Sequence, residues 1–110
     1  MNKLESIEGL EYFNTSMAYT MESMFSGCSS LTSLDLSSFN TENVTYMTWM
    51  FKGCSGLTSL DVSSFNTEKV ESMEQMFSGC FGLTSLDVSG FKTDKVVRMG
   101  GYVFKLLQSE

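Results

Sequence analysis

Residues 24–49 read MFSGCSSLTSLDLSSFNTENVTYMTW, and the chain then begins this stretch again. Residues 50–75 read MFKGCSGLTSLDVSSFNTEKVESMEQ and residues 76–101 read MFSGCFGLTSLDVSGFKTDKVVRMGG, so the period is 26 residues without an insertion. A period of this length indicates an array of stacked units, because one unit alone cannot bury its apolar face. The repeat therefore predicts the fold far more directly than the function, which depends on the exposed positions.

Both ends of the chain depart from the repeat. Residues 1–23 keep a degenerate copy of it, in which Thr15 aligns with Thr41. Terminal repeats are usually atypical, so we expect this copy to be the N-terminal capping repeat. Residues 102–110 leave the pattern and form a tail. We therefore expect a single repeat domain over residues 1–110.

A short strand is predicted within each copy. Leu34 and Leu36 would point to one side and Asp35 to the other, as the alternation of side chains along a strand requires. Strands are expected near residues 33–36, 59–62 and 85–88.

The residues that follow each strand show the spacing of a helix. Val44, Met47 and Met50 are each three residues apart and would form one apolar face. Asn40 can cap the first turn, and Gly53 stands where a left-handed residue would end the helix. Helices are expected over roughly residues 42–51, 68–77 and 94–104.

These elements together predict an α/β fold, a leucine-rich-repeat-like right-handed solenoid. Short parallel strands would form one face and short helices the other, in about four coils. Stacking would place equivalent apolar side chains in one continuous core, where each buried leucine, methionine or phenylalanine contributes roughly 1.5–3 kcal/mol.

Composition argues against several classes of function. The formal net charge of −6 disfavours binding to nucleic acid or to anionic lipid. The chain has no histidine, which removes the commonest general base and nitrogen ligand for metals. No apolar run is long enough to span a bilayer, and Met1 opens no apolar leader, so an exported chain would be an excised piece or lack its leader. We expect no enzymatic activity, cofactor, metal or membrane insertion.

Three aspartates one period apart form the first candidate site. Stacking would bring Asp35, Asp61 and Asp87 into a column of carboxylates, which could bind calcium. The alternative, which we favour, is that each aspartate accepts hydrogen bonds from a nearby serine or threonine, because no known calcium-loop pattern is present. The polar face around them is a candidate surface for a protein ligand, and its members are Ser33, Asp35, Ser37, Ser59, Asp61, Ser63, Ser85 and Asp87.

Two aromatic residues stand among the non-repeating positions. Tyr46 and Trp49 would lie on the outer side of one helix, where an exposed aromatic pair is a plausible contact site for a protein. The alternative is that Trp49 folds over the next coil as packing. The sequence leaves both open.

The cysteines also recur once per period. Stacking would place Cys28, Cys54 and Cys80 near the spacing that a disulfide tolerates, but the number is odd and the short-spaced pairs of thiolate metal sites are missing. We favour buried free thiols that act as small apolar fillers.

The pattern LxxLDLSSFNTxxVxxMxxMFxGC resembles the BspA-like repeats of bacterial surface proteins. Residues 31–54 and 57–80 carry it throughout, and residues 83–99 carry most of it. The resemblance implies a leucine-rich-repeat-like solenoid on a cell surface or in a secreted protein, and a host matrix or plasma protein as partner. It brings no catalytic residues with it.

We therefore expect a non-enzymatic surface or secreted module that mediates protein–protein interaction or adhesion to host proteins. The alternative is a structural spacer within a larger surface protein, without a ligand of its own. An open final coil could also stack on a second molecule, so end-to-end self-association is a further expectation.

Overall fold

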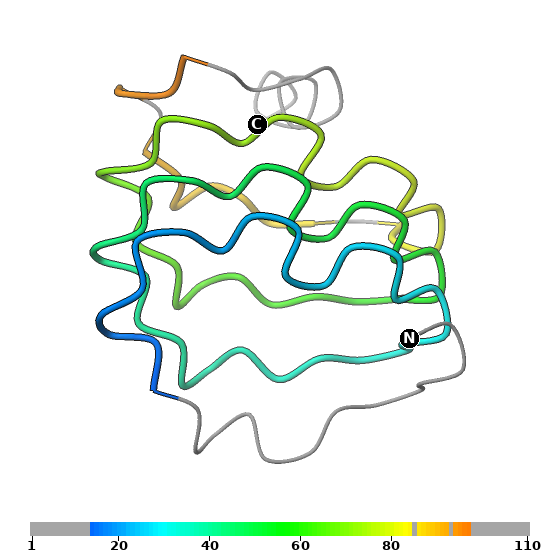
Figure 1. Ribbon diagram of the computed structural model, residues 1–110. Helices are drawn as coiled ribbons and strands as arrows, with labels where there is room; N and C mark the ends of the chain where they lie inside the picture. Colours follow the sequence, from blue (N-terminus) through cyan, green and yellow to red (C-terminus); the bar gives the residue numbers. More distant parts are fainter. Residues whose placement is uncertain (1–13, 85, 93, 98–110) are drawn as a thin grey trace.

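The computed structural model describes residues 14–84, 86–92 and 94–97. The chain winds repeatedly around a common interior, and successive copies of the repeat lie side by side (Figure 1). Residues 14–23 occupy the place ahead of the first full copy, since the Tyr19 carbonyl accepts the Thr45 N–H at 2.7 Å. Residues 1–13 and the predicted tail lie outside the described residues.

The prediction of a leucine-rich-repeat-like right-handed α/β solenoid is wrong. The described residues contain no helix, and their β pairing is limited to isolated parallel bridges, Thr20 with Tyr46 and Tyr46 with Ser72. The segments at 33–36 and 59–62 run extended but form no strand. It follows that no helix capable of crossing a membrane occurs in the described part of the chain.

Where helices were expected over 42–51 and 68–77, the chain forms a succession of turns. The described part of 94–104, which ends at residue 97, is not helical either. We call residues 20–28, 46–54 and 72–80 the ladder segments.

Backbone N–H groups in the ladder segments alternate between two kinds of partner. The Phe51 N–H donates to the Met76 carbonyl of the next copy at 2.9 Å. The adjacent Lys52 N–H instead donates back to the Trp49 carbonyl at 3.1 Å, closing a turn. A helix needs every N–H for a carbonyl four residues earlier, so this alternation excludes one. Further inter-copy bonds join Met21 to Tyr46, Ser23 to Thr48, Phe25 to Met50, Gly27 to Lys52, Met47 to Ser72, Trp49 to Glu74 and Gly53 to Ser78.

Left-handed residues also separate the ladder segments from a helix. Trp49 has a φ of 60° and Gly53 a φ of 80°, whereas an α-helix needs about −63°. Ser23 and Gln75, one period away from Trp49, have φ values of 61° and 53°. Gly53 thus adopts the conformation expected of it, but within a ladder segment instead of at a helix end.

The helix-like spacing nevertheless predicted correctly which side chains are buried. Val44, Met47 and Met50 are all fully buried. A chain of three-residue turns returns every third side chain to the same side, as a helix approximately does, so apolar spacing alone did not separate the two.

Stacked phenylalanine rings run through the core. The ring centroids of Phe25 and Phe51 lie 5.6 Å apart at an interplanar angle of 9°, and those of Phe51 and Phe77 lie 5.5 Å apart at 3°. A second column, Phe39 on Phe65, contacts the first at 6.4 Å between Phe51 and Phe65. Equivalent rings from successive copies therefore share one interior, in offset-stacked geometry.

A buried threonine joins each copy to the next. Thr41 Oγ1 accepts the N–H of Asn66 at 2.7 Å and donates to the carbonyl of Asn66 at 3.0 Å. One hydroxyl therefore satisfies both backbone groups of one residue at a place where no strand pairing does so. The same pair of hydrogen bonds links Thr15 to Asn40 and Thr67 to Lys92.

Neighbouring copies approach so closely at Gly56 and at Gly82, one period later, that only glycine fits there. A Cβ added at Gly56 would lie 2.6 Å from the Ser29 carbonyl oxygen and 2.8 Å from that of Leu31. A Cβ at Gly82 would lie 2.5 Å from the Leu57 carbonyl oxygen. These contacts are with backbone, which cannot turn aside as a flexible side chain can.

We expect Gly56→Ala to lower the free energy of unfolding by at least about 2 kcal/mol, because the added methyl group forces the copies apart. Gly90→Ala is the matched control, since a Cβ there meets no atom within 4 Å. Urea denaturation followed by circular dichroism measures both variants. Equal effects from the two would contradict the close approach at Gly56.

We expect Thr41→Val to cost about 2 kcal/mol of stability, because it leaves the N–H and carbonyl of Asn66 without their partner. Thr41→Ser keeps the hydroxyl and should retain most of the stability. A valine variant that unfolds at the same urea concentration as the parent would show that the threonine bonds contribute nothing.

Candidate functional site

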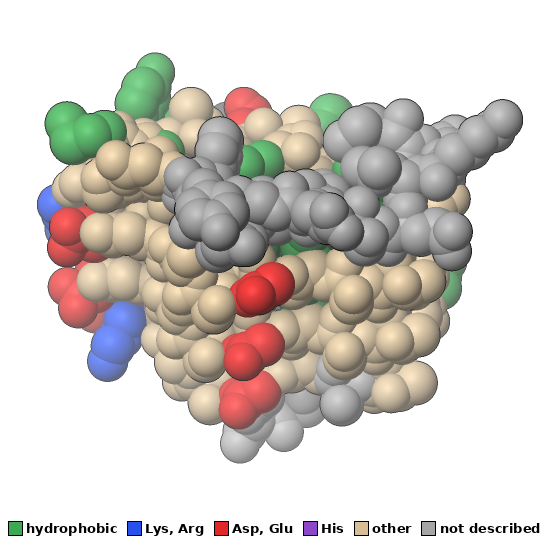
Figure 2. Space-filling model, turned by 90° about the horizontal axis from the view of Figure 1, so that it is seen from below, with side chains coloured by type: hydrophobic (Ala, Val, Ile, Leu, Met, Phe, Trp, Pro, Cys, Tyr) green, Lys and Arg blue, Asp and Glu red, His purple; other side chains and the backbone are tan. Residues whose placement is uncertain are grey.

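The predicted aspartate column lies on one exposed face of the molecule. Asp35, Asp61 and Asp87 come from successive copies and are all exposed. Figure 2 shows acidic side chains aligned along this surface. We call the exposed residues of 33–37, 59–63 and 86–89 the extended face.

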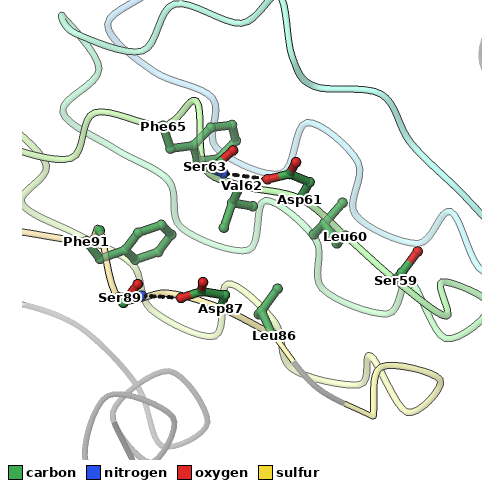
Figure 3. A pocket seen from close by; sticks show the side chains of 11 residues that line it. Ser59, Leu60, Asp61, Val62, Ser63, Phe65, Leu86, Asp87, Ser89 and Phe91 are labelled. Atoms are coloured by element: carbon green, nitrogen blue, oxygen red, sulfur yellow. Dashed lines mark hydrogen bonds between the residues drawn. The ribbon is translucent and has the colours of Figure 1, made fainter.

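Each aspartate is held by the serine that follows it two residues later. Asp35 Oδ1 accepts the Ser37 N–H at 3.0 Å and the Ser37 hydroxyl at 2.7 Å. Asp61 and Asp87 accept the N–H groups of Ser63 and Ser89, each at 2.9 Å (Figure 3). The favoured interpretation is therefore confirmed: each aspartate is hydrogen-bonded to a nearby serine and closes an Asx turn.

These hydrogen bonds favour the ionised form of the carboxylates. The side chain and then the backbone of Ser37 lower the pKa of Asp35 below its ordinary value, because both donate to the charged form. Ser63 and Ser89 lower the pKa of Asp61 and Asp87 in the same way. The described residues bring together no group of three or more histidine, cysteine, aspartate or glutamate side chains that could hold a metal ion.

A shallow groove on the extended face separates two neighbouring copies. Its volume is about 450 Å³, and Asp61, Asp87, Phe65 and Phe91 are among the residues that line it (Figure 3). Of the other predicted binding residues, Ser33, Ser37, Ser59 and Ser63 are exposed, and Ser85 lies outside the described residues.

The predicted aromatic pair lies on the ladder segments, away from the extended face. Trp49 keeps 42% of its surface exposed and Tyr46 keeps 41%. The Lys52 Nζ atom lies 4.2 Å from the centroid of the Trp49 ring, in cation–π geometry. Trp49 is therefore partly exposed, with the Lys52 ammonium over its ring.

A second groove surrounds Tyr46, and sequence reasoning did not identify it. Its volume is about 390 Å³. We call it the Tyr46 groove, and it is lined by Glu22, Tyr46, Thr48, Glu71, Ser72, Glu74 and Val97. The 26-residue offset could have indicated it, since Glu22, Thr48 and Glu74 occupy one repeat position. Glu71 and Glu74 were instead assigned to the helix expected over residues 68–77, so they were not compared with residues of the neighbouring copies.

The cysteines are buried free thiols, as expected. The Sγ atom of Cys54 donates to the Phe25 carbonyl at 3.0 Å, and that of Cys80 to the Phe51 carbonyl at 3.0 Å. Burial raises the pKa of Cys54 to about 12 and that of Cys80 to about 11, and it also raises the pKa of Cys28. These thiols remain protonated at neutral pH and therefore contribute packing and inter-copy hydrogen bonds instead of reactivity.

A family model described as "Mycoplasma protein of unknown function, DUF285" matches residues 1–109 of the chain. No curated protein and no solved structure matches it.

We expect Ser37→Ala to raise the pKa of Asp35 towards its ordinary value of about 3.9, because the side-chain donor is lost while the backbone donor stays. A depressed native pKa stabilises the fold above the unfolded-state pKa, and this contribution disappears as pH falls through the native pKa. Carbon-13 NMR titration of the carboxyl groups measures the shift, with Asp87 in the same sample as the internal control. An unchanged Asp35 titration would show that the Ser37 hydroxyl does not stabilise the carboxylate.

Proposed function

The chain belongs to this Mycoplasma family of unknown function, so we propose its role from the properties of its surface. We propose that it is a non-enzymatic repeat module that binds another protein. The observation that carries the proposal is the exposure of Tyr46 and Trp49 on a frame whose repeated apolar positions are buried. Exposed aromatic residues of this kind dominate the energetics of protein interfaces. Neither residue belongs to the repeat consensus, so stacking of the copies does not require them.

The resemblance to BspA-like repeats supports a finer proposal about place and partner. We propose that the module acts at a bacterial cell surface or in a secreted protein, with a host matrix or plasma protein as ligand. Self-association through the ends of the array stays a prediction, since both ends lie outside the described residues.

A structural spacer is the second candidate. The monotony of the extended face favours it, because Ser33, Asp35 and Ser37 recur as Ser59, Asp61 and Ser63. Most of these polar groups close their own turns and offer little that differs from copy to copy. The spacer role predicts that an unrelated rigid segment of equal length can replace the array without loss of function.

We expect at least one purified extracellular-matrix or plasma protein to bind the immobilised chain in a surface-plasmon-resonance panel. Trp49→Ala should weaken that binding by at least about tenfold, since truncation of an interface tryptophan commonly costs more than 1.4 kcal/mol. Phe81→Ala is the matched control, because it removes another exposed aromatic side chain, 87% exposed, that belongs to neither candidate surface. A flat response across the panel would overturn the binding proposal and favour the spacer.

A further inference from the structure

We propose that the Tyr46 groove binds a basic segment of the partner protein, with a lysine or arginine side chain over the Tyr46 ring between flanking carboxylates. The inference rests on the protein-binding function proposed above and names the chemistry of the partner. It is carried by the register of the copies, by carboxylates that pair with no lysine among the described residues, and by exposed apolar surface at the same groove.

The register of the copies places acidic residues beside Tyr46, in the copies before and after it. Tyr46 pairs in parallel with Thr20 on one side and Ser72 on the other. The copy that holds Thr20 contributes Glu22 to the groove, and the copy that holds Ser72 contributes Glu74. Glu22 and Glu74 share the repeat position of Thr48, two residues along the chain from Tyr46. Adjacent parallel chains are about 4.8 Å apart, so these two glutamates lie roughly 10 Å apart across the groove.

The groove carries negative charge that the described residues do not neutralise. Glu22, Glu71 and Glu74 line it, and no ion pair joins any of them to a lysine within the described part of the chain. Lys52, which shares the ladder segment 46–54 with Tyr46, lies over the Trp49 ring instead. Three carboxylates around one groove attract a cationic partner and repel an acidic one.

Aromatic and apolar surface adds a second reason for a basic side chain. The Lys52 ammonium over Trp49 shows within this chain that an aromatic ring on a ladder segment accepts a cation. Tyr46 presents the same kind of ring one turn earlier, with 41% of its surface exposed. An arginine guanidinium can stack on such a ring while it donates to carboxylates at its edges.

The partner must also bring apolar groups. Val97 is 80% exposed and Tyr19 is 64% exposed. They lie at opposite ends of one row of inter-copy bonds, in which Thr45 donates to Tyr19, Glu71 to Thr45 and Val97 to Glu71, at 2.7–2.8 Å. This row runs directly beside Tyr46, so a segment that crosses the copies would meet charge at the centre and apolar surface at each end.

The aspartate column provides a contrast on the same molecule. Asp35, Asp61 and Asp87 already accept hydrogen bonds from their own serines and lie on the extended face. The glutamates of the Tyr46 groove receive no such bonds to their carboxylates within the described residues. Asp61→Asn therefore removes the same charge as Glu74→Gln at a place that should not matter for binding.

The test uses a short peptide in which three arginines alternate with glycines, and a matched peptide with citrulline at those positions. Nitrogen-15 NMR of the full chain should show shifts centred on Tyr46, Glu71 and Glu74 with the arginine peptide and none with the citrulline peptide. Glu74→Gln should weaken binding at least about fivefold, Tyr46→Ala should do the same, and Asp61→Asn should change it less than about twofold. Tyr46→Phe keeps the ring and should retain binding, which separates loss of the cation site from loss of fold.

Equal binding of the citrulline peptide, equal weakening by Asp61→Asn, or shifts centred on the extended face would each overturn the inference. Its failure is separable from that of the proposed function. A matrix or plasma protein that binds irrespective of Glu74→Gln refutes the basic segment and leaves the binding role intact. A panel without any binder, together with a groove that takes the arginine peptide, refutes the host-protein role and leaves the groove chemistry standing.

Discussion

Hydrogen bonding from one copy to the next is the constraint on which this structure depends. The described residues form neither helices nor strands, so buried backbone groups must find partners elsewhere or pay the cost of burial unpaired. Alternate N–H groups of the ladder segments 20–28 and 46–54, such as those of Trp49 and Phe51, donate to the next copy. The Thr41 hydroxyl serves both backbone groups of Asn66 in the next copy. Because each of these bonds spans 25 residues, a single copy cannot satisfy its own backbone.

The same constraint explains which part of the fold the sequence could predict. Burial follows directly from the 26-residue period, so Met47, Met50 and Leu36 were placed inside correctly. The backbone conformation could not be predicted, because apolar residues three positions apart fit a succession of turns as well as a helix. The left-handed conformation of Trp49 could not be predicted from its residue type, since tryptophan has no preference for that conformation. Asn40 was interpreted as a helix cap, although its side-chain oxygen accepts the Glu42 N–H and closes an Asx turn.

The candidate site divides along similar lines. The aspartate–serine turns followed from the repeat, since residue types and spacing are the same in each copy. The Tyr46 groove required the register between copies, which brings Glu22 and Glu74 from two other copies to the groove that Tyr46 lines. Repeated positions thus build the frame, and the positions that vary between copies give one face its individual chemistry. A binding role for the face that carries the Tyr46 groove is consistent with this division. The repeated apolar side chains of the interior serve packing.

Scalar couplings measured by NMR through individual hydrogen bonds test the account most directly. We expect correlations from the amide nitrogen of Phe51 to the carbonyl carbon of Met76 and from Phe25 to Met50, across successive copies. Correlations from residues 46–51 to carbonyls four residues earlier in the same copy would instead reveal helices, and would contradict the inter-copy hydrogen bonding on which the fold is argued to rest.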